Sequence, residues 1–341
     1  MSTVKIAAID LGTVSSRLLC AEMSNGQITA STKRTVITDL GERVDATGVF
    51  APAAIDRVTQ ACTEFVRKAR EFGAQHVCCT LTSAARDVSN GNDLLDRLRD
   101  LGLVPQVIPG EVEARLTFYG VAHDFANERI AVADSGGGST ELVVGRACDE
   151  GLELDCTESL NIGCRRVTER FFSSVPPSAD ELDKAAAWAR AQFEPYWAGL
   201  ANRPERLVAV GGTVTTLVAM VHELAVYDSH FVHLRDLTIE QVEDGIDRMR
   251  SLTVEQIAQL PGIQAKRASV ILAGAIVVRE LMRAGGYGRL TVSENSLLAG
   301  AAALAAKRIV GDTLAGAAAT IYEAAMSGRT VIGWIPELSS W

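Results

Sequence analysis

The chain has 341 residues, of which 48% are hydrophobic and 22% charged, and it carries a net charge of -9. This length exceeds what one hydrophobic core usually organises, so it predicts two domains, and the composition excludes a largely disordered chain. The acidic balance disfavours broad nucleic-acid binding, which needs a basic face. A polyanionic substrate stays open, provided that local arginines, backbone N-H groups and a metal ion hold it.

The N-terminus lacks the basic start and apolar stretch of a signal peptide, and other apolar stretches are interrupted too early to span a bilayer. Seven cysteines, an odd number without C-x-x-C spacing, argue against a disulfide framework and a zinc site. We therefore expect a cytoplasmic protein with buried thiols, without a membrane or nucleic-acid partner. The sequence leaves a homodimer open.

Short, apolar and β-rich, residues 4–9 predict a buried strand that ends in a glycine turn. Residues 16–23 and 27–37 predict two further strands, and Asn25-Gly26 between them is a strong hairpin signal. The N-terminal segment is therefore expected to form a small antiparallel sheet.

Apolar residues from position 52 to 72 fall on one face of a helix, which Gly73 ends. Strands and helices then alternate, and this alternation predicts an α/β fold. The predicted elements of this region are the strand 75–81, the helix 94–101, the strand 105–108 and the helix 111–122.

The second half restarts the plan of the first, with a strand at 129–133, a glycine turn at 134–139 and a returning strand at 140–145. This weak internal repeat predicts two domains built alike, with two aspartate turns facing each other across a cleft. The remaining predicted elements are a strand at 206–210, a helix at 214–224, a helical pattern from 238 interrupted by a strand at 289–292, and a last helix near 313–326.

Three glycine turns, at 10–13, 134–140 and 211–213, each follow a predicted strand. Such a turn presents several backbone N-H groups at one point, where they can bind phosphate oxygens. Three consecutive glycines cost conformational entropy on folding, so the second turn favours phosphate contact over a plain turn. Asp10 and Asp134 could hold a divalent cation or only cap their turns, and their equivalent positions in the repeat favour the metal or water role.

Seven collinear segments resemble the exopolyphosphatase and guanosine pentaphosphate phosphohydrolase (Ppx/GppA) family, a branch of the actin and sugar kinase superfamily. They are AAIDLGTVSSRLL (7–19), TSAARDVSNG (82–91), GEVEARLTFYGV (110–121), VADSGGGSTELVVG (132–145), LNIGCRRVTERF (160–171), AVGGTVTTLVAM (209–220) and LPGIQAKRASVILAGA (260–275).

The resemblance implies a short member with two actin-like (ribonuclease H-like) ATPase-superfamily domains and an interdomain cleft. Their expected bounds are 1–125 and 126–309, with a C-terminal helix at about 310–341 that packs back on the first domain.

The resemblance assigns a role to the start of the predicted helix 111–122. In the family, the second acidic residue at this helix start is regarded as the base that activates water, and the resemblance places Glu113 in that position. The alternative is a solvated glutamate that stabilises the first helical turn. Glu141 matches a residue thought to hold metal or water, and its alternative is an ordinary strand residue. The predicted catalytic residues are therefore Glu113, Asp134 and Asp10, and the predicted ligands of Mg²⁺ or another divalent cation are Asp10, Asp134 and Glu141.

Arginines complete the predicted phosphate site, because the bidentate guanidinium group matches phosphate oxygens. Arg17 and Arg86 match phosphate-contacting positions of the family, as do Arg166 and Arg267, for which a surface ion pair is an equal alternative. The predicted phosphate-binding residues are Gly12, Thr13, Ser15, Arg17, Arg86, Gly136, Gly137, Gly138, Ser139, Thr140, Gly211, Gly212, Thr213, Arg166 and Arg267.

The resemblance implies release of terminal phosphate from inorganic polyphosphate, guanosine pentaphosphate or both. Two alternatives remain, a phosphotransferase of the same superfamily and a catalytically impaired polyphosphate or alarmone sensor. The sensor is considered because Leu298 and Ala299 stand where the family has arginine and glutamate, which puts chain-length preference and activity in doubt.

Overall fold

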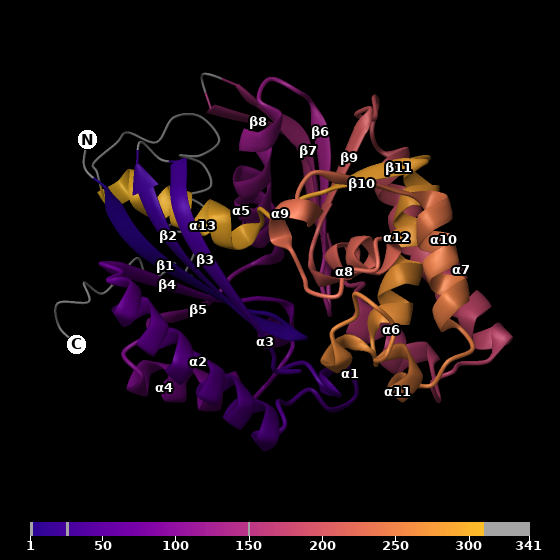
Figure 1. Ribbon diagram of the computed structural model, residues 1–341, viewed down its shortest axis with the longest axis horizontal. Coiled ribbons are helices and arrows are strands. Elements are labelled where there is room, and N and C mark those ends of the chain that lie inside the picture. Colours follow the sequence, from indigo (N-terminus) through magenta and orange to yellow (C-terminus); the bar gives the residue numbers. More distant parts are fainter. Residues whose placement is uncertain (1–2, 25–26, 149–150, 310–341) are drawn as a thin grey trace. The chain divides into compact units, whose positions relative to one another are not determined.

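The computed structural model describes residues 3–24, 27–148 and 151–309, which form two compact units (Figure 1). Unit 1 lies within residues 1–128, 146–154 and 295–341, and unit 2 within 129–145 and 155–294. The chain first passes from unit 1 to unit 2 after residue 128, close to the predicted domain boundary at 125.

The sheet of unit 1 has the strand order β3-β2-β1-β4-β5. Its strands are β1 (Val4–Leu11), β2 (Ser15–Ser24), β3 (Gln27–Ile37), β4 (His76–Leu81) and β5 (Pro105–Val107). β1 pairs antiparallel with β2 and parallel with β4, and all but one of its residues are buried. An apolar strand buried on both faces belongs at the centre of a sheet that helices cover. The predicted hairpin turn at 25–26 lies outside the described residues.

Helix α2 (Pro52–Phe72) is the long helix that the sequence predicts in unit 1. Pro52 suits the first helical position, and Gly73 ends the helix in the left-handed region with φ 75°. Its buried residues join the core beneath β1 and β4. The other helical segments are α1 (Val44–Thr47), α3 (Ser83–Arg86), α4 (Gly91–Asp100), α5 (Gly110–Ala122) and η1 (His123–Phe125).

Helix α13 (Leu297–Ile309) packs against α5, β1 and β2 and belongs to unit 1. The sequence-based boundary at 309, which assigns this segment to the second domain, is therefore wrong for it. A side chain on Gly120 would collide with the backbone of Ser296, and one on Gly300 with the Leu116 carbonyl. The two helices thus cross in direct backbone contact, which only glycine permits. The predicted C-terminal helix at 310–341 lies outside the described residues.

The sheet of unit 2 has the order β10-β11-β9-β6-β7-β8 and repeats the plan of the first. β6 pairs antiparallel with β7 and parallel with β9, as β1 does with β2 and β4, and β10 adds an antiparallel edge strand. The predicted α/β fold and its internal repeat are therefore confirmed. The strands are β6 (Ile130–Ser135), β7 (Thr140–Cys148), β8 (Gly151–Leu160), β9 (Arg206–Val210), β10 (Arg235–Thr238) and β11 (Arg289–Val292).

The helical pattern predicted from residue 238 is broken into shorter segments. Gly262, with φ 80°, lies against the Ala219 and Met220 backbone and interrupts it, because a side chain would collide there. The helical segments of unit 2 are α6 (Cys164–Phe171), α7 (Ala179–Ala198), α8 (Gly212–Val221), α9 (Ser229–Val232), α10 (Ile239–Met249), α11 (Val254–Ile257), η2 (Ala265–Arg267) and α12 (Ile271–Gly285). α12 packs against α6, α7, α8 and α10 and is the central helix of the unit.

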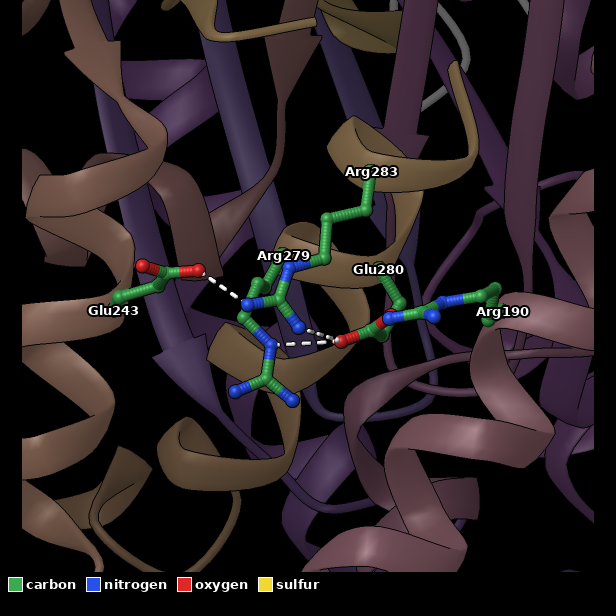
Figure 2. Close-up of polar contacts among 5 residues, drawn as sticks. All are labelled: Arg190, Glu243, Arg279, Glu280 and Arg283. Atoms are coloured by element: carbon green, nitrogen blue, oxygen red, sulfur yellow. Dashed lines mark hydrogen bonds and ion pairs between the residues drawn. The ribbon is translucent and has the colours of Figure 1, made fainter. Parts of the chain in front are cut away.

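A buried ion network joins α7, α10 and α12 (Figure 2). Glu280 has no exposed surface, and its carboxylate accepts from Arg190 at 2.7 Å, Arg279 at 2.7 Å and Arg283 at 3.1 Å. Arg283 also pairs with Glu243 on α10. A fully buried carboxylate is tolerated only when cations and hydrogen bonds compensate for its lost hydration, so this network fixes the relative positions of the three helices.

Candidate functional site

The first glycine turn connects β1 with β2, whose register pairs Asp10 with Arg17. The Gly12 N-H donates to the Ser15 carbonyl at 3.0 Å and closes the turn. Within the described residues, the N-H groups of Thr13 and Val14 have no acceptor. Two consecutive unfilled N-H groups in a tight turn form an anion-binding concavity.

Asp10 is 1% exposed and is held from one side. Its Oδ2 accepts from Arg17 Nε at 3.0 Å and from Nη2 at 2.6 Å. Its Oδ1 is buried and has no hydrogen-bond partner among the described residues. A buried carboxylate oxygen without a partner is costly unless a water molecule or a cation binds it, so this atom fits the predicted metal or water role.

The second glycine turn connects β6 with β7 and matches the first residue by residue. Here the register pairs Asp134 with Glu141, and the Gly136 N-H donates to the Ser139 carbonyl at the same 3.0 Å. The N-H groups of Gly137 and Gly138 correspond to those of Thr13 and Val14, and within the described residues they too have no acceptor. The repeat has therefore conserved the anion-binding geometry of the backbone.

Helix α6 forms hydrogen bonds to the backbone carbonyl groups of the second turn. The N-H groups of Arg165 and Arg166 donate to the Gly137 carbonyl, and Arg166 Nε donates to the Gly138 carbonyl at 2.9 Å. A side chain on Gly163 would collide with the Gly137 backbone. Because α6 binds the carbonyl groups of the turn, the unfilled N-H groups of the turn are available to a ligand.

Asp134 and Glu141 place two carboxylates directly opposite each other on neighbouring strands, 4% and 2% exposed. Glu141 accepts from the Ser159 hydroxyl at 2.8 Å. Side chains at opposed positions of antiparallel strands lie within contact distance, and two buried like charges there repel each other. This pair therefore suits a divalent cation, which removes the repulsion.

The third glycine turn directly adjoins the second. Gly211 has φ 104°, and a side chain on it would approach the Ser135 carbonyl to 2.7 Å. The Arg267 guanidinium lies where a side chain of Gly212 would otherwise be, at the N-terminus of α8. Thr213, the other predicted residue of this turn, is buried. A guanidinium group and a helix N-terminus at one point together favour an anion.

Glu113 lies in the first turn of α5 and is 8% exposed. Its Oε2 accepts from Arg86 Nη1 at 2.8 Å, and the same nitrogen donates to the Ile108 carbonyl at 3.0 Å. The predicted base is therefore not a freely solvated helix-end glutamate. Arg86 holds the carboxylate in a fixed position.

Ranges 3–24, 27–148 and 151–309 contain no group of three or more histidine, cysteine, aspartate or glutamate residues placed to hold a metal ion, and this includes the predicted set of Asp10, Asp134 and Glu141. None of the seven cysteines, all within these ranges, forms a disulfide. Burial raises the pKa of Cys62 and of Cys78 to about 12. Across the same ranges, no helix has the length and apolar character needed to cross a membrane.

Comparison with known proteins identifies the family. The model of the Ppx/GppA phosphatase family matches residues 19–301. The protein belongs to this family. It is 37% identical over 322 residues to exopolyphosphatase 2 of Mycobacterium tuberculosis, covering 89% of this chain and 98% of that one. By class, this family member is a phosphoanhydride hydrolase.

Two further relatives extend the comparison. A Photobacterium profundum guanosine-5'-triphosphate,3'-diphosphate pyrophosphatase is 27% identical over 86% of this chain, which spans 58% of that protein. The crystal structure of the Aquifex aeolicus Ppx/GppA family member is similar with a TM-score of 0.75 and 29% identity, covering 92% of this chain and all of that one. The family fold predicted from the sequence is therefore confirmed.

Three arginines predicted to contact phosphate bind protein acceptors in this Ppx/GppA chain. Arg17 binds Asp10, Arg86 binds Glu113 and Arg166 binds the Gly138 carbonyl. These contacts do not test phosphate binding, but they give each arginine a positioning role that the sequence could not predict. The partners are brought together by strand pairing and by loop packing.

The altered C-terminal motif has a structural explanation. Leu298 and Ala299 are 4% and 5% exposed in α13, beside the Gly300 crossing with α5. At buried positions, apolar side chains avoid the cost of unpaired charges. The substitution thus suits the core of unit 1.

Proposed function

We propose that this protein releases the terminal phosphate of inorganic polyphosphate or guanosine pentaphosphate by metal-assisted hydrolysis, with Glu113 as the base. The observation that carries the proposal is the pair of equivalent glycine turns, each with two consecutive unfilled N-H groups. Such groups bind the oxygens of a phosphate chain without a competing side chain. The named activities of the relatives from Mycobacterium tuberculosis and Photobacterium profundum support these two substrates.

Asp134 and Glu141 are the residues that would hold a divalent cation, Mg²⁺ or another. Their cross-strand pairing and burial fit such an ion. In unit 1, the unpartnered Oδ1 of Asp10 is by itself a candidate oxygen ligand. A bound cation would neutralise phosphate charge. Because two carboxylates leave positions of its coordination shell open, phosphate oxygens and water would supply the other ligands.

Glu113 would orient a water molecule and accept its proton as the water oxygen attacks the terminal phosphorus. The P-O bond to the bridging oxygen breaks, and the shortened phosphate chain leaves. Arg86 supports this role because its contacts with Glu113 and the Ile108 carbonyl restrict the carboxylate to one position. A base must be held in place before its proton transfer can be effective.

The test is phosphate release from both substrates by the wild type and by Glu113→Gln. We expect kcat to fall roughly 100- to 10,000-fold, the usual contribution of general-base catalysis, with an unchanged melting temperature. Glu111→Gln is the matched control, because Glu111 is an exposed glutamate of the same helical turn.

Other outcomes would select an alternative. Full activity in Glu113→Gln would exclude this residue as the base. Phosphate transfer to a nucleoside diphosphate without hydrolysis would identify a phosphotransferase. Tight binding of either phosphate chain without release, across divalent metals, would identify a sensor.

A further inference from the structure

A group of side chains outside the predicted site lies at the same end of the unit 2 sheet as the third glycine turn. Glu294 follows β11, and Tyr227 lies in the loop between α8 and α9. The Tyr227 hydroxyl donates to Glu294 Oε1. The Glu294 backbone N-H donates to His233 Nδ1 at 3.2 Å. These contacts tie the loop to the end of β11.

The Tyr227 hydroxyl is next to the third turn. The Thr215 side chain, in the first turn of α8, lies close to this phenol, and its hydroxyl donates to the Gly211 carbonyl. Arg267, which lies against Gly212, is close enough for its charge to act on the phenol. The Tyr227 hydroxyl therefore lies close to several of the elements that surround a predicted phosphate-binding turn.

Tyr227 is partly exposed although its hydroxyl is fixed and buried. Tyr227 is 42% exposed, and the adjacent Val226 is 82% exposed. Across the described ranges, five large hydrophobic side chains are exposed, and three of them, Val226, Tyr227 and Leu234, fall between residues 226 and 234. Burial and the Glu294 charge raise the pKa of Tyr227, so the hydroxyl keeps its proton and stays a donor. A ring fixed at its polar end offers an apolar surface at low entropic cost.

The charge of this group argues against another phosphate here. Glu294 places a carboxylate against the Tyr227 hydroxyl, and a carboxylate repels a phosphate at that place. A carboxylate instead accepts hydrogen bonds from N-H and O-H groups, which a purine base and a ribose provide. An exposed aromatic ring beside it can stack on a base.

We propose that Tyr227, with Val226 and Glu294, forms a subsite that receives the nucleoside of a nucleotide substrate whose phosphates occupy the glycine turns. This inference rests on the proposed function and specifies guanosine pentaphosphate as a substrate that uses contacts polyphosphate does not. Tyr227 would stack on the base, and Glu294 would accept from its N-H groups or from ribose hydroxyls.

The experiment compares two substrates and three variants. With Tyr227→Ala, KM for guanosine pentaphosphate is expected to rise roughly 5- to 100-fold, the effect of losing one base-aromatic stacking contact. The kcat/KM for polyphosphate stays unchanged. Tyr227→Phe keeps the ring and should retain most nucleotide affinity. Leu234→Ala, which removes another exposed apolar side chain of this segment, is the matched control and should affect neither substrate.

Glu294→Gln separates charge from packing. The amide oxygen still accepts from Tyr227, but the negative charge is gone. We expect the ratio of the two kcat/KM values to shift toward polyphosphate, since repulsion of phosphate decreases and the acceptor for the nucleoside weakens.

Equal losses on both substrates, or no loss with Tyr227→Ala, would overturn the subsite and leave Tyr227 as a structural residue. If the wild type hydrolyses neither substrate, the proposed function fails while the subsite is still tested. Calorimetric titration of guanosine pentaphosphate would then show weaker binding in Tyr227→Ala than in the wild type and Leu234→Ala. No binding to the wild type, or equal binding to all three proteins, would refute the subsite.

Discussion

The two aspartate turns have the same backbone but opposite charge at one register position. Asp10 lies opposite Arg17, whereas Asp134 lies opposite Glu141. In unit 1 the protein supplies the cation that compensates the buried aspartate. In unit 2 the equivalent position doubles the negative charge. The repeat thus provides two turns with similar backbones, and we propose that the charge opposite the aspartate makes the second the better candidate for a divalent cation.

The largest expected effect tests this difference through the metal requirement. Glu141→Gln is expected to raise the Mg²⁺ concentration for half-maximal phosphate release roughly 10- to 100-fold, because the paired carboxylate loses one charge. Arg17→Gln, at the equivalent position of unit 1, should leave that concentration nearly unchanged. Metal titrations of both variants measure this, with Glu153→Gln as an exposed control. A larger shift for Arg17→Gln would reverse the assignment of the two halves.

The second effect concerns stability, and here we expect the substitution in unit 1 to have the larger effect. Arg17→Gln leaves the buried Asp10 without its cation, and we expect a loss of about 2 kcal/mol, less than for a fully buried pair because Arg17 is partly exposed. Arg166→Gln removes a bond to a neutral carbonyl and should cost about 1 kcal/mol. Chemical denaturation compares the two variants. Equal losses would mean that the Asp10 ion pair contributes no more than a neutral hydrogen bond.

The smallest effect tests whether the two turns are structurally equivalent. In Gly12→Ala and in Gly136→Ala the new methyl group lies 3.2 Å from the carbonyl that closes the turn. Both substitutions should therefore cost about 1 kcal/mol of unfolding free energy. Thermal and chemical unfolding of the two variants check this equality. A clear difference between them would show that the surroundings of the turns, rather than their backbone, set the tolerance.

Much of this fold could be predicted because its signals are local. The apolar pattern of residues 4–9, the helix from Pro52 to Gly73 and the restart of the pattern at residue 129 each depend on neighbours in sequence, and the structure confirms them. Helices α6 and α7 were not predicted. α7 has a capping box at Ser178 and Glu181 that a closer search for helix starts could have found.

The candidate site likewise has parts that the sequence could predict and parts that it could not. The glycine turns could be read from the sequence, because three glycines after a strand and an aspartate are an uncommon local pattern. Tyr227 and Glu294 were not predicted, since they lie 67 residues apart and meet only through the packing of a loop against the end of β11. The nearest signal was the altered motif at Leu298 and Ala299, a few residues after Glu294.

The sequence by itself determined the fold class, the repeat, the family and the positions of the glycine turns, because strand pattern and turn chemistry are encoded within short segments. Only the tertiary structure decided which charges meet. It pairs Arg17 with Asp10 and Arg86 with Glu113, places Glu141 beside Asp134 and assigns α13 to unit 1. Strand register and helix packing bring distant residues together, and these contacts depend on the folded chain as a whole.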